Sequence, residues 1–214
     1  MQPLDKQEPE FDLERQAKLI RRGRFFLDFL KVNRIMPPTE VAEPIAAAYA
    51  RIVSFFAGDC GISKPKGFLL FGTTGCGKTT LVKAMRDCCR EHMKRHPNKD
   101  GIIFIRARRL CEEYISDEYF LSRLREDTRK KTVIIDDLGT DRSVNRYGVP
   151  WGLEDYLEDR YDTWEEFGFP TLITTNYQTP KAVLERYGER AMSRLIGMVD
   201  FVAYNYHDRR VHGD

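Results

Sequence analysis

The hydrophobic residues of this chain fall into short runs that are separated by longer amphipathic stretches. Five of these runs have the length of a β-strand: FLLF at 68–71, IIFI at 102–105, TVIID at 132–136, TLITTN at 171–176 and DFVAY at 200–204. Mainly apolar runs without polar alternation are typical of strands that are buried on both faces. The pattern therefore predicts an α/β fold with a five-stranded parallel sheet flanked by helices.

Helical periodicity fills the gaps between these runs. Helices are expected from about 78, from 107 to about 130, over 151–167, and from Thr179-Pro180 onward. A threonine followed by proline is a common helix start, and a glycine is a common helix end, so the last helix is expected to end at Gly188.

The N-terminal part has a different character. Residues 11–33 predict a helix with a basic and an apolar patch, and MPPTEVAEP then interrupts it. Thr39 is a plausible N-cap for a second helix, in which apolar residues recur at 45, 49, 52 and 56. We therefore divide the chain into an N-terminal helical extension, 1–38, and an α/β domain, 39–214. The extension could serve as a partner-binding arm or simply pack on the domain.

The composition narrows the class of protein. Lys and Arg number 35, Asp and Glu number 33, and the net charge is +2, so bulk charge does not indicate nucleic-acid binding. No apolar run is long enough for a membrane span, and the N-terminus lacks the apolar core of a signal peptide. Five cysteines without a C-x-x-C pair are typical of reduced thiols, and we expect a cytoplasmic protein.

The segment GTTGCGKT follows the first strand and opens the helix expected from about residue 78. It fits the phosphate-binding P-loop pattern, in which backbone N–H groups and the helix N-terminus surround phosphate oxygens. Lys78 is expected to bridge the β- and γ-phosphates, and the Thr79 hydroxyl to bind Mg²⁺. The residues expected to bind the nucleotide, which we take to be ATP, are Gly72, Thr73, Thr74, Gly75, Cys76, Gly77, Lys78, Thr79 and Thr80.

Polar side chains end the third and fourth strands. Asp136 and Asp137 end TVIIDD, where two buried acids are costly unless they have partners or chemistry. We predict that Asp136 binds Mg²⁺ with Thr79, and that Asp137 polarises the attacking water. Asn176 would hold that water toward Asp137, although an asparagine after a strand is also a common turn residue.

A fourth segment, YGERAMSRLIG at 187–197, carries Arg190 and Arg194. Four residues apart on a helix, they share one face and need a negative partner. That partner is either a surface carboxylate or a phosphate.

This order of motifs resembles the AAA+ ATPases, and more narrowly the DnaC/IstB-like family of bacterial replicative helicase loaders and transposition helper ATPases. The resemblance rests on Gly72–Thr79, Asp136-Asp137, Asn176 and GERAMSRL, and it covers about residues 40 to 210. It implies that Asn176 is the sensor asparagine and that Arg194 is an arginine finger reaching the γ-phosphate of a neighbouring subunit. Arg190 would be its helper, and the C-terminal lid would be absent or reduced. Arg209 or Arg210 could be the second-sensor arginine.

The resemblance implies an ATPase that loads or remodels a replicative DNA helicase on DNA, working as an oligomer. A transposase is the alternative partner. From other classes, a monomeric P-loop nucleotide kinase and a non-hydrolysing ATP-gated adaptor remain open.

Two weaker signals complete the analysis. A basic cluster could bind the phosphates of single-stranded DNA, with Tyr114, Tyr119 or Phe120 stacking on the bases, or it could be a solvated helix face. The cluster comprises Arg106, Arg108, Arg109, Arg123, Arg125, Arg129, Lys130 and Lys131. Cys88, His92 and His96 have the spacing of metal ligands, but Cys88 and His92 fall on the apolar face of their helix, which favours core packing.

Overall fold

The computed structural model describes residues 65–95, 101–117, 119–146 and 149–204, together with Arg24, Asp28, Leu30, Ala50 and Ile52. These five isolated residues are helical. The two helices predicted before residue 60, the boundary at 38/39 and Arg209 or Arg210 fall almost entirely outside the described residues, so those predictions stay open.

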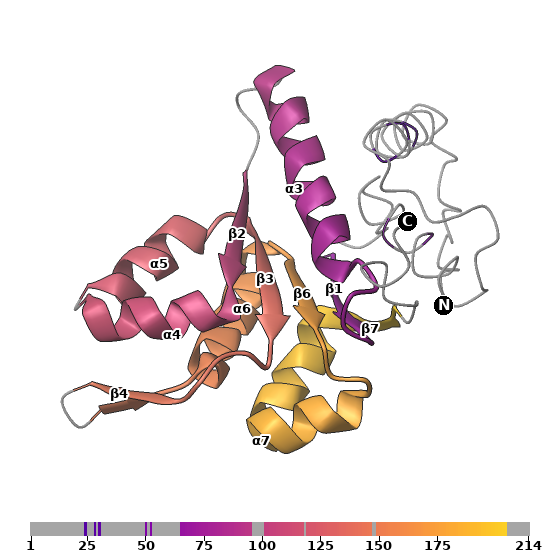
Figure 1. Cartoon of the computed structure of the whole chain (residues 1–214). Helices are drawn as coiled ribbons and strands as arrows, with labels where there is room; N and C mark the ends of the chain where they lie inside the picture. The colour runs from indigo at the N-terminus through magenta and orange to yellow at the C-terminus, as the bar shows by residue number, and fades with distance from the viewer. Residues whose placement is uncertain are drawn as a thin grey trace, which may run out of the picture.

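Five parallel strands form the main sheet, in the order β2-β3-β6-β1-β7 (Figure 1). Their bounds are β1 Gly67–Phe71, β2 Ile102–Arg106, β3 Thr132–Leu138, β6 Thr171–Thr175 and β7 Val199–Ala203. All five predicted strands are therefore confirmed. The order also places β6 between β3 and β1, so the ends of these three strands meet at the same edge of the sheet.

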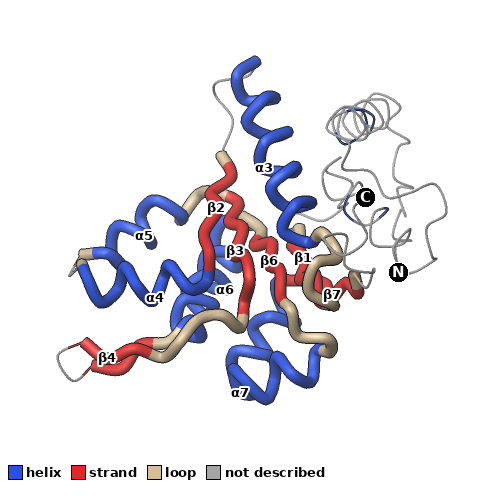
Figure 2. Tube along the Cα trace, in the orientation of Figure 1, coloured by secondary structure: helices blue, strands red, loops and turns tan. Residues whose placement is uncertain are grey.

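Helices cover both faces of this sheet (Figure 2). They are α3 Lys78–Arg95, α4 Ala107–Ser116, α5 Phe120–Thr128, α6 Leu153–Phe167 and α7 Pro180–Met198. Alternate residues of each strand enter two separate cores. Phe68 and Ile134 pack with α3 on one face, whereas Leu69 and Ile135 pack with the other four helices on the opposite face. In the described part of the chain, no helix has the length and apolar character needed to cross a bilayer.

Two predicted helices have different limits in the structure. The prediction of a single helix over 107 to about 130 is wrong, because the structure has two helices there, α4 and α5, with a break between them. Asp117 there has an extended backbone, and its carboxylate accepts a hydrogen bond from the Tyr119 N–H (3.0 Å). A short hairpin, β4 Val144–Arg146 and β5 Val149–Trp151, precedes α6 and includes the start of the range predicted as helical. Three-residue strands are too short to leave a periodic pattern in the sequence.

The predicted end of a helix at Gly188 is confirmed as a break within α7. Gly188 has φ 80° and ψ 172°, so two helical segments meet there at an angle. Thr179 also caps the helix as expected, because its hydroxyl accepts a hydrogen bond from the Ala182 N–H (3.3 Å).

A buried arginine on α6 ties together the edge of the sheet at which the strands begin. Arg160 is 1 % exposed and donates to the Thr171 hydroxyl (3.1 Å) and to the carbonyl oxygens of Thr128 (2.8 Å), Lys131 (3.3 Å) and Phe169 (3.2 Å). Burial lowers its pKa. No carboxylate forms an ion pair with it in the described part of the chain, so this cation acts as a multiple hydrogen-bond donor.

We expect Arg160→Leu to lower the free energy of unfolding by about 3–5 kcal/mol, because buried carbonyl groups would lose their donors. Thermal unfolding should show a fall in Tm on the order of 10 °C. Arg125→Leu is the matched control. Arg125 is 55 % exposed, and its guanidinium forms an ion pair (2.7 Å) with Asp159, the residue that precedes Arg160. That surface pair should contribute at most about 1 kcal/mol. Equal Tm values for the two variants would contradict the role of Arg160.

Candidate nucleotide site

The P-loop lies between β1 and α3 and encloses one side of a cavity. Gly72, Gly75 and Gly77 have φ of 146°, 82° and 100°, values that side chains disfavour, so the loop needs glycine at these positions. The cavity has a volume of about 300 Å³. It is lined by Thr74, Gly75, Gly77, Lys78, Thr79, Thr80, Asp137 and Asn176. The structure thus brings residues of three sequence motifs together in one place.

Three residues of the predicted nucleotide set do not line this cavity. Gly72 and Thr73 instead contribute carbonyl oxygens behind it, which accept hydrogen bonds from the Lys78 ammonium (2.9 and 2.7 Å). Cys76 is buried, and its thiol donates to the Tyr204 carbonyl at the end of β7 (3.0 Å). These contacts hold Lys78, which is 4 % exposed, within the loop.

Asp136 and the P-loop meet directly. Asp136 is 1 % exposed, and its Oδ1 accepts hydrogen bonds from the hydroxyls of Thr79 (2.8 Å) and Thr174 (2.8 Å). A hydroxyl and a carboxylate side by side are hard oxygen donors that suit Mg²⁺. The residues present therefore fit the ion, with Thr79 and Asp136 as the groups that would hold it.

Asp137 has a different environment from its neighbour. Its φ of 59° is the only positive value at a non-glycine residue in the described part of the chain. The pKa of its carboxyl is raised, first by burial and then by the negative charge of Asp136, while Lys78 and Arg106 oppose this shift. Asn176 Nδ2 donates to Asp137 Oδ1 (3.4 Å), so the amide and the acid lie together as the sequence predicts. A carboxylate with a raised pKa is a better proton acceptor than an ordinary aspartate.

Two threonines of β6 that the sequence did not single out bind the main chain of β3, one at Asp137 and one at the residue after it. The pairing of β3 with β6 shifts register between Ile135 and Leu138, which interrupts the regular ladder at the acids. Thr174 accepts from the Asp137 N–H (3.0 Å), and Thr175 donates to the Leu138 carbonyl (2.7 Å). The available signal was two adjacent threonines at the end of a fully buried strand, where each hydroxyl needs a partner.

A second buried acid connects this region to α7. Asp141 is 5 % exposed and accepts hydrogen bonds from the Gly139 N–H (3.0 Å), the Arg186 guanidinium (3.0 Å) and the Tyr187 hydroxyl. Burial and the Asp141 charge raise the pKa of Tyr187, so this phenol stays protonated. The loop after the acid pair is thereby fastened to the segment of α7 immediately before the break at Gly188.

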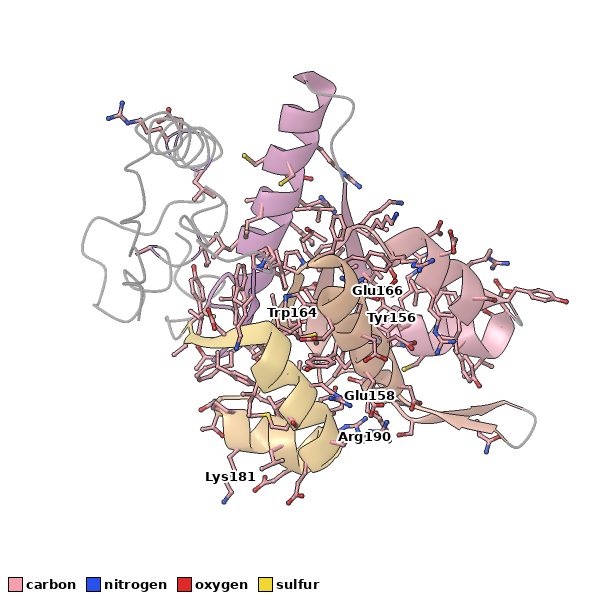
Figure 3. All side chains as sticks on the ribbon, turned by 180° about the vertical axis from the view of Figure 1, so that it is seen from behind. Tyr156, Glu158, Trp164, Glu166, Lys181 and Arg190 are labelled. Carbon is pink, nitrogen blue, oxygen red and sulfur yellow. The ribbon has the colours of Figure 1, made fainter. Side chains whose placement is uncertain are left out.

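The two predicted arginines lie beyond that break and do not line the cavity of their own chain. Arg190 pairs with Glu158 of α6 (2.6 Å), toward which it points in Figure 3. The Arg194 guanidinium lies over the Tyr161 ring (4.6 Å to the centroid). Gly197 leaves room for this ring, because a Cβ there would lie 2.6 Å from a ring carbon. Arg194 is thus supported by an aromatic platform on the flank formed by α6 and α7.

Ion pairs account for much of the basic cluster. Its arginines pair with nearby acids as Arg108–Glu112, Arg109–Glu113, Arg123–Asp117, Arg125–Asp159 and Arg129–Glu166. Phe120 is buried (7 % exposed), so its assignment as a DNA-stacking residue is wrong, whereas Tyr119 is 65 % exposed. The structure favours the solvated-face interpretation for these arginines.

The metal-site interpretation of Cys88, His92 and His96 also lacks support. Cys88 lies in the core, and the described residues contain no cluster of three such ligands. The side chains of both histidines fall outside the described part. Cys76, Cys88, Cys89 and Cys111 are free thiols, and burial raises the pKa of Cys88 and Cys89 to about 12.

Comparison with known proteins places this architecture. No known protein family profile matches the chain. A 93-residue part is 31% identical to the ATPase family gene 2 protein homolog B of Bos taurus; this match covers 40% of the chain but only 11% of that longer protein.

Two solved structures extend the comparison to most of the chain. The DnaC helicase loader superposes with a TM-score of 0.55 and 20% identity, over 77% of this chain and 92% of that one. The Orc1 protein of Aeropyrum pernix in complex with DNA has a TM-score of 0.54 and 17% identity, over 89% of this chain and 52% of that one. The chain has the fold of the AAA+ ATPases. The resemblance inferred from the motifs is therefore confirmed at the level of the fold. In this fold the glycine-rich loop follows β1, the acid pair lies near the end of β3, and Asn176 follows β6.

Proposed function

We propose that this chain is an AAA+ ATPase that binds and hydrolyses Mg-ATP in order to load or remodel a replicative helicase on DNA. One observation carries the ATPase proposal. A single cavity brings together the P-loop Lys78 and Thr79, the acid Asp137 and the amide Asn176, with Asp136 directly behind Thr79. Phosphoryl transfer depends mainly on positioning and charge stabilisation, and this set of groups supplies both.

Each residue has a defined task in this proposal. Lys78 exchanges the carbonyl oxygens of Gly72 and Thr73 for phosphate oxygens, which leaves its charge satisfied throughout. Mg²⁺, when bound by Thr79 and Asp136, would neutralise charge on the phosphates. Asp137 accepts a proton from the attacking water, and the Asn176 side-chain amide orients that water. The amide nitrogen lies 3.4 Å from Asp137 Oδ1.

The cavity supports a second part of the proposal, which is assembly. Among the described residues that line it, Lys78 is the one cation. Further positive charge at the γ-phosphate therefore has to come from outside this set. We propose that Arg194 of a neighbouring subunit provides it, from its position over Tyr161 on the α6–α7 flank, with Arg190 as its helper.

The proposed role in replication is supported by the two structural likenesses. One is to a helicase loader, and the other is to a protein solved with DNA. Residues 1–38 are proposed as the arm that contacts the partner, and a cytoplasmic location is proposed with it. Single-stranded DNA is proposed as a ligand through exposed groups such as Tyr119, although most of the neighbouring arginines already have acidic partners.

An ATPase titration against protein concentration tests the proposal. Activity per subunit should rise as the concentration is increased, because each site is completed by another chain, and single-stranded DNA should increase it further. Constant activity per subunit would contradict assembly. Transfer of phosphate to a nucleoside monophosphate would identify a nucleotide kinase instead, and absence of hydrolysis with DNA present would identify an ATP-gated adaptor.

Affinity capture then tests the partner. The full chain, loaded with a slowly hydrolysed ATP analogue, should retain a hexameric replicative helicase from a lysate of its host. Recovery of a transposase in place of a helicase would replace the loading role by a transposition helper role and would leave the ATPase proposal intact.

A further inference from the structure

One buried hydroxyl contacts both acids of the proposed ATPase site. Thr174 lies on β6 with 0 % exposure. Its Oγ1 donates to Asp136 Oδ1 (2.8 Å) and accepts from the Asp137 N–H (3.0 Å). A threonine hydroxyl has one proton to donate, and here it donates that proton to a charged carboxylate, which is a stronger hydrogen-bond acceptor than a neutral group. Thr174 therefore connects the side chain of one acid to the main chain of the next.

The strand pairing explains why a side chain is needed here. The register shift between Ile135 and Leu138 removes regular backbone partners where the two acids lie. Asp137 also has a positive φ, a conformation that persists in a non-glycine residue only where its surroundings impose it. The Thr174 hydroxyl satisfies the N–H of this residue and so helps to hold the irregular backbone.

The same hydroxyl determines how Asp136 is presented. Asp136 Oδ1 receives two hydrogen bonds, one from Thr79 and one from Thr174. If Thr79 turns its hydroxyl toward a metal ion, Thr174 still holds Oδ1 and the carboxylate keeps its orientation.

We propose that Thr174 is a positioning residue of the ATPase reaction, which fixes the Asp136 carboxylate and the Asp137 backbone in one geometry. This inference rests on the proposed ATPase function. Thr174 does not line the cavity, so it would act through the two acids and not on the nucleotide.

Thr175 provides a matched control on the same strand. It is also 0 % exposed, and its hydroxyl also makes two hydrogen bonds, donating to the Leu138 carbonyl (2.7 Å) and accepting from the Tyr177 N–H (3.2 Å). Neither partner is an acid of the site. Thr175→Val thus removes a buried hydroxyl of the same kind without touching Asp136 or Asp137.

The experiment compares Thr174→Val, Thr174→Ser and Thr175→Val in the full chain. We expect Thr174→Val to lower kcat about 10–100-fold and to raise the Mg²⁺ concentration at half-maximal rate by a similar factor, as is usual when a group that orients a metal ligand is removed. KM for ATP should change less than about twofold, because the P-loop contacts remain. Thr174→Ser keeps the hydroxyl and should stay within about threefold of the unmodified chain in both values. Thr175→Val should lose Tm to the same extent as Thr174→Val but keep its kcat.

The outcomes separate this inference from the function on which it rests. If the unmodified chain hydrolyses ATP and Thr174→Val keeps its kcat and Mg²⁺ dependence, the inference is overturned and the ATPase proposal stands. Equal losses of kcat in Thr174→Val and Thr175→Val would also overturn it, because the effect would then belong to the sheet edge in general. If the unmodified chain binds ATP without hydrolysis, the ATPase proposal fails, and titration of Mn²⁺ into the ADP-bound protein decides the role of Thr174. Weaker Mn²⁺ binding in Thr174→Val supports it, and unchanged binding rejects it.

Discussion

Lys78→Ala should abolish measurable ATP hydrolysis and weaken ATP binding by about 10²–10⁴-fold. The Lys78 ammonium lies in the cavity wall and already makes two hydrogen bonds to loop carbonyl oxygens, at 2.9 and 2.7 Å. Bound phosphate would take over these donors. Hydrogen bonds to charged groups contribute about 1.5–3 kcal/mol each, so the loss of two costs about 3–6 kcal/mol. Isothermal titration with an ATP analogue and a phosphate-release assay measure the two effects.

Lys83→Ala is the control for this variant. Lys83 lies on the same helix, and its ammonium sits over the Phe104 ring (5.8 Å) and does not line the cavity. The two variants remove the same charge from α3, but only Lys78→Ala should affect ATP. Normal ATPase activity in Lys78→Ala would refute the assignment of residues 72–79 as a phosphate-binding loop.

Arg194→Ala should lower the hydrolysis rate by about 10³–10⁵-fold while ATP affinity stays nearly unchanged. That range is typical of an arginine that stabilises transition-state charge in phosphoryl transfer, and corresponds to roughly 4–7 kcal/mol. Binding is spared because Arg194 contacts Tyr161 and does not line its own chain's cavity. The lost cation–π contact should cost about 0.5–1 kcal/mol of stability, so the variant stays folded. Single-turnover hydrolysis and equilibrium ATP binding separate the two quantities.

Mixing two inactive variants tests whether Arg194 acts on another subunit. Arg194→Ala retains an intact nucleotide site, whereas Lys78→Ala retains an intact arginine. If the arginine acts between chains, a mixture should recover hydrolysis that neither variant shows alone. Lys181→Ala, an exposed change in the first segment of α7, should keep full activity. A mixture that stays inactive would place the catalytic arginine elsewhere, and Arg190 would be tested next after releasing it from Glu158.

The break in α7 suggests why these arginines sit where they do. Asp141 fastens Arg186 and Tyr187 to the loop after the acid pair, and the chain turns at Gly188 directly afterwards. The segment that carries Arg190 and Arg194 then packs on α6. Its position therefore depends on a buried contact near the acids as well as on its own helix.

Much of the fold and of the candidate site could be predicted from local sequence patterns. The five apolar runs became the five strands because the strands of a parallel sheet with helices on both faces need little more than continuous hydrophobicity. Lys78, Thr79, Asp137 and Asn176 could be expected at one place, because parallel strands bring their carboxyl ends to the same edge of a sheet. The prediction of one helix over 107–130 was wrong because the interruption depends on a local hydrogen bond of one aspartate, Asp117. Hydrophobic periodicity carries no information about such a bond.

By itself, then, the sequence determined the strands, the phosphate loop and the residue types at the strand ends, since each depends on neighbours a few positions away. Only the tertiary structure decided the remaining features. They include the strand order, the burial of Arg160, the support of Arg194 by Tyr161 and the link from Thr174 to both acids. The physical reason is that a buried hydrogen bond or ring contact needs two groups within a few ångströms, and Thr174 and Asp136 are 38 residues apart in the chain. Their meeting depends on the register of β3 against β6, which no local pattern encodes.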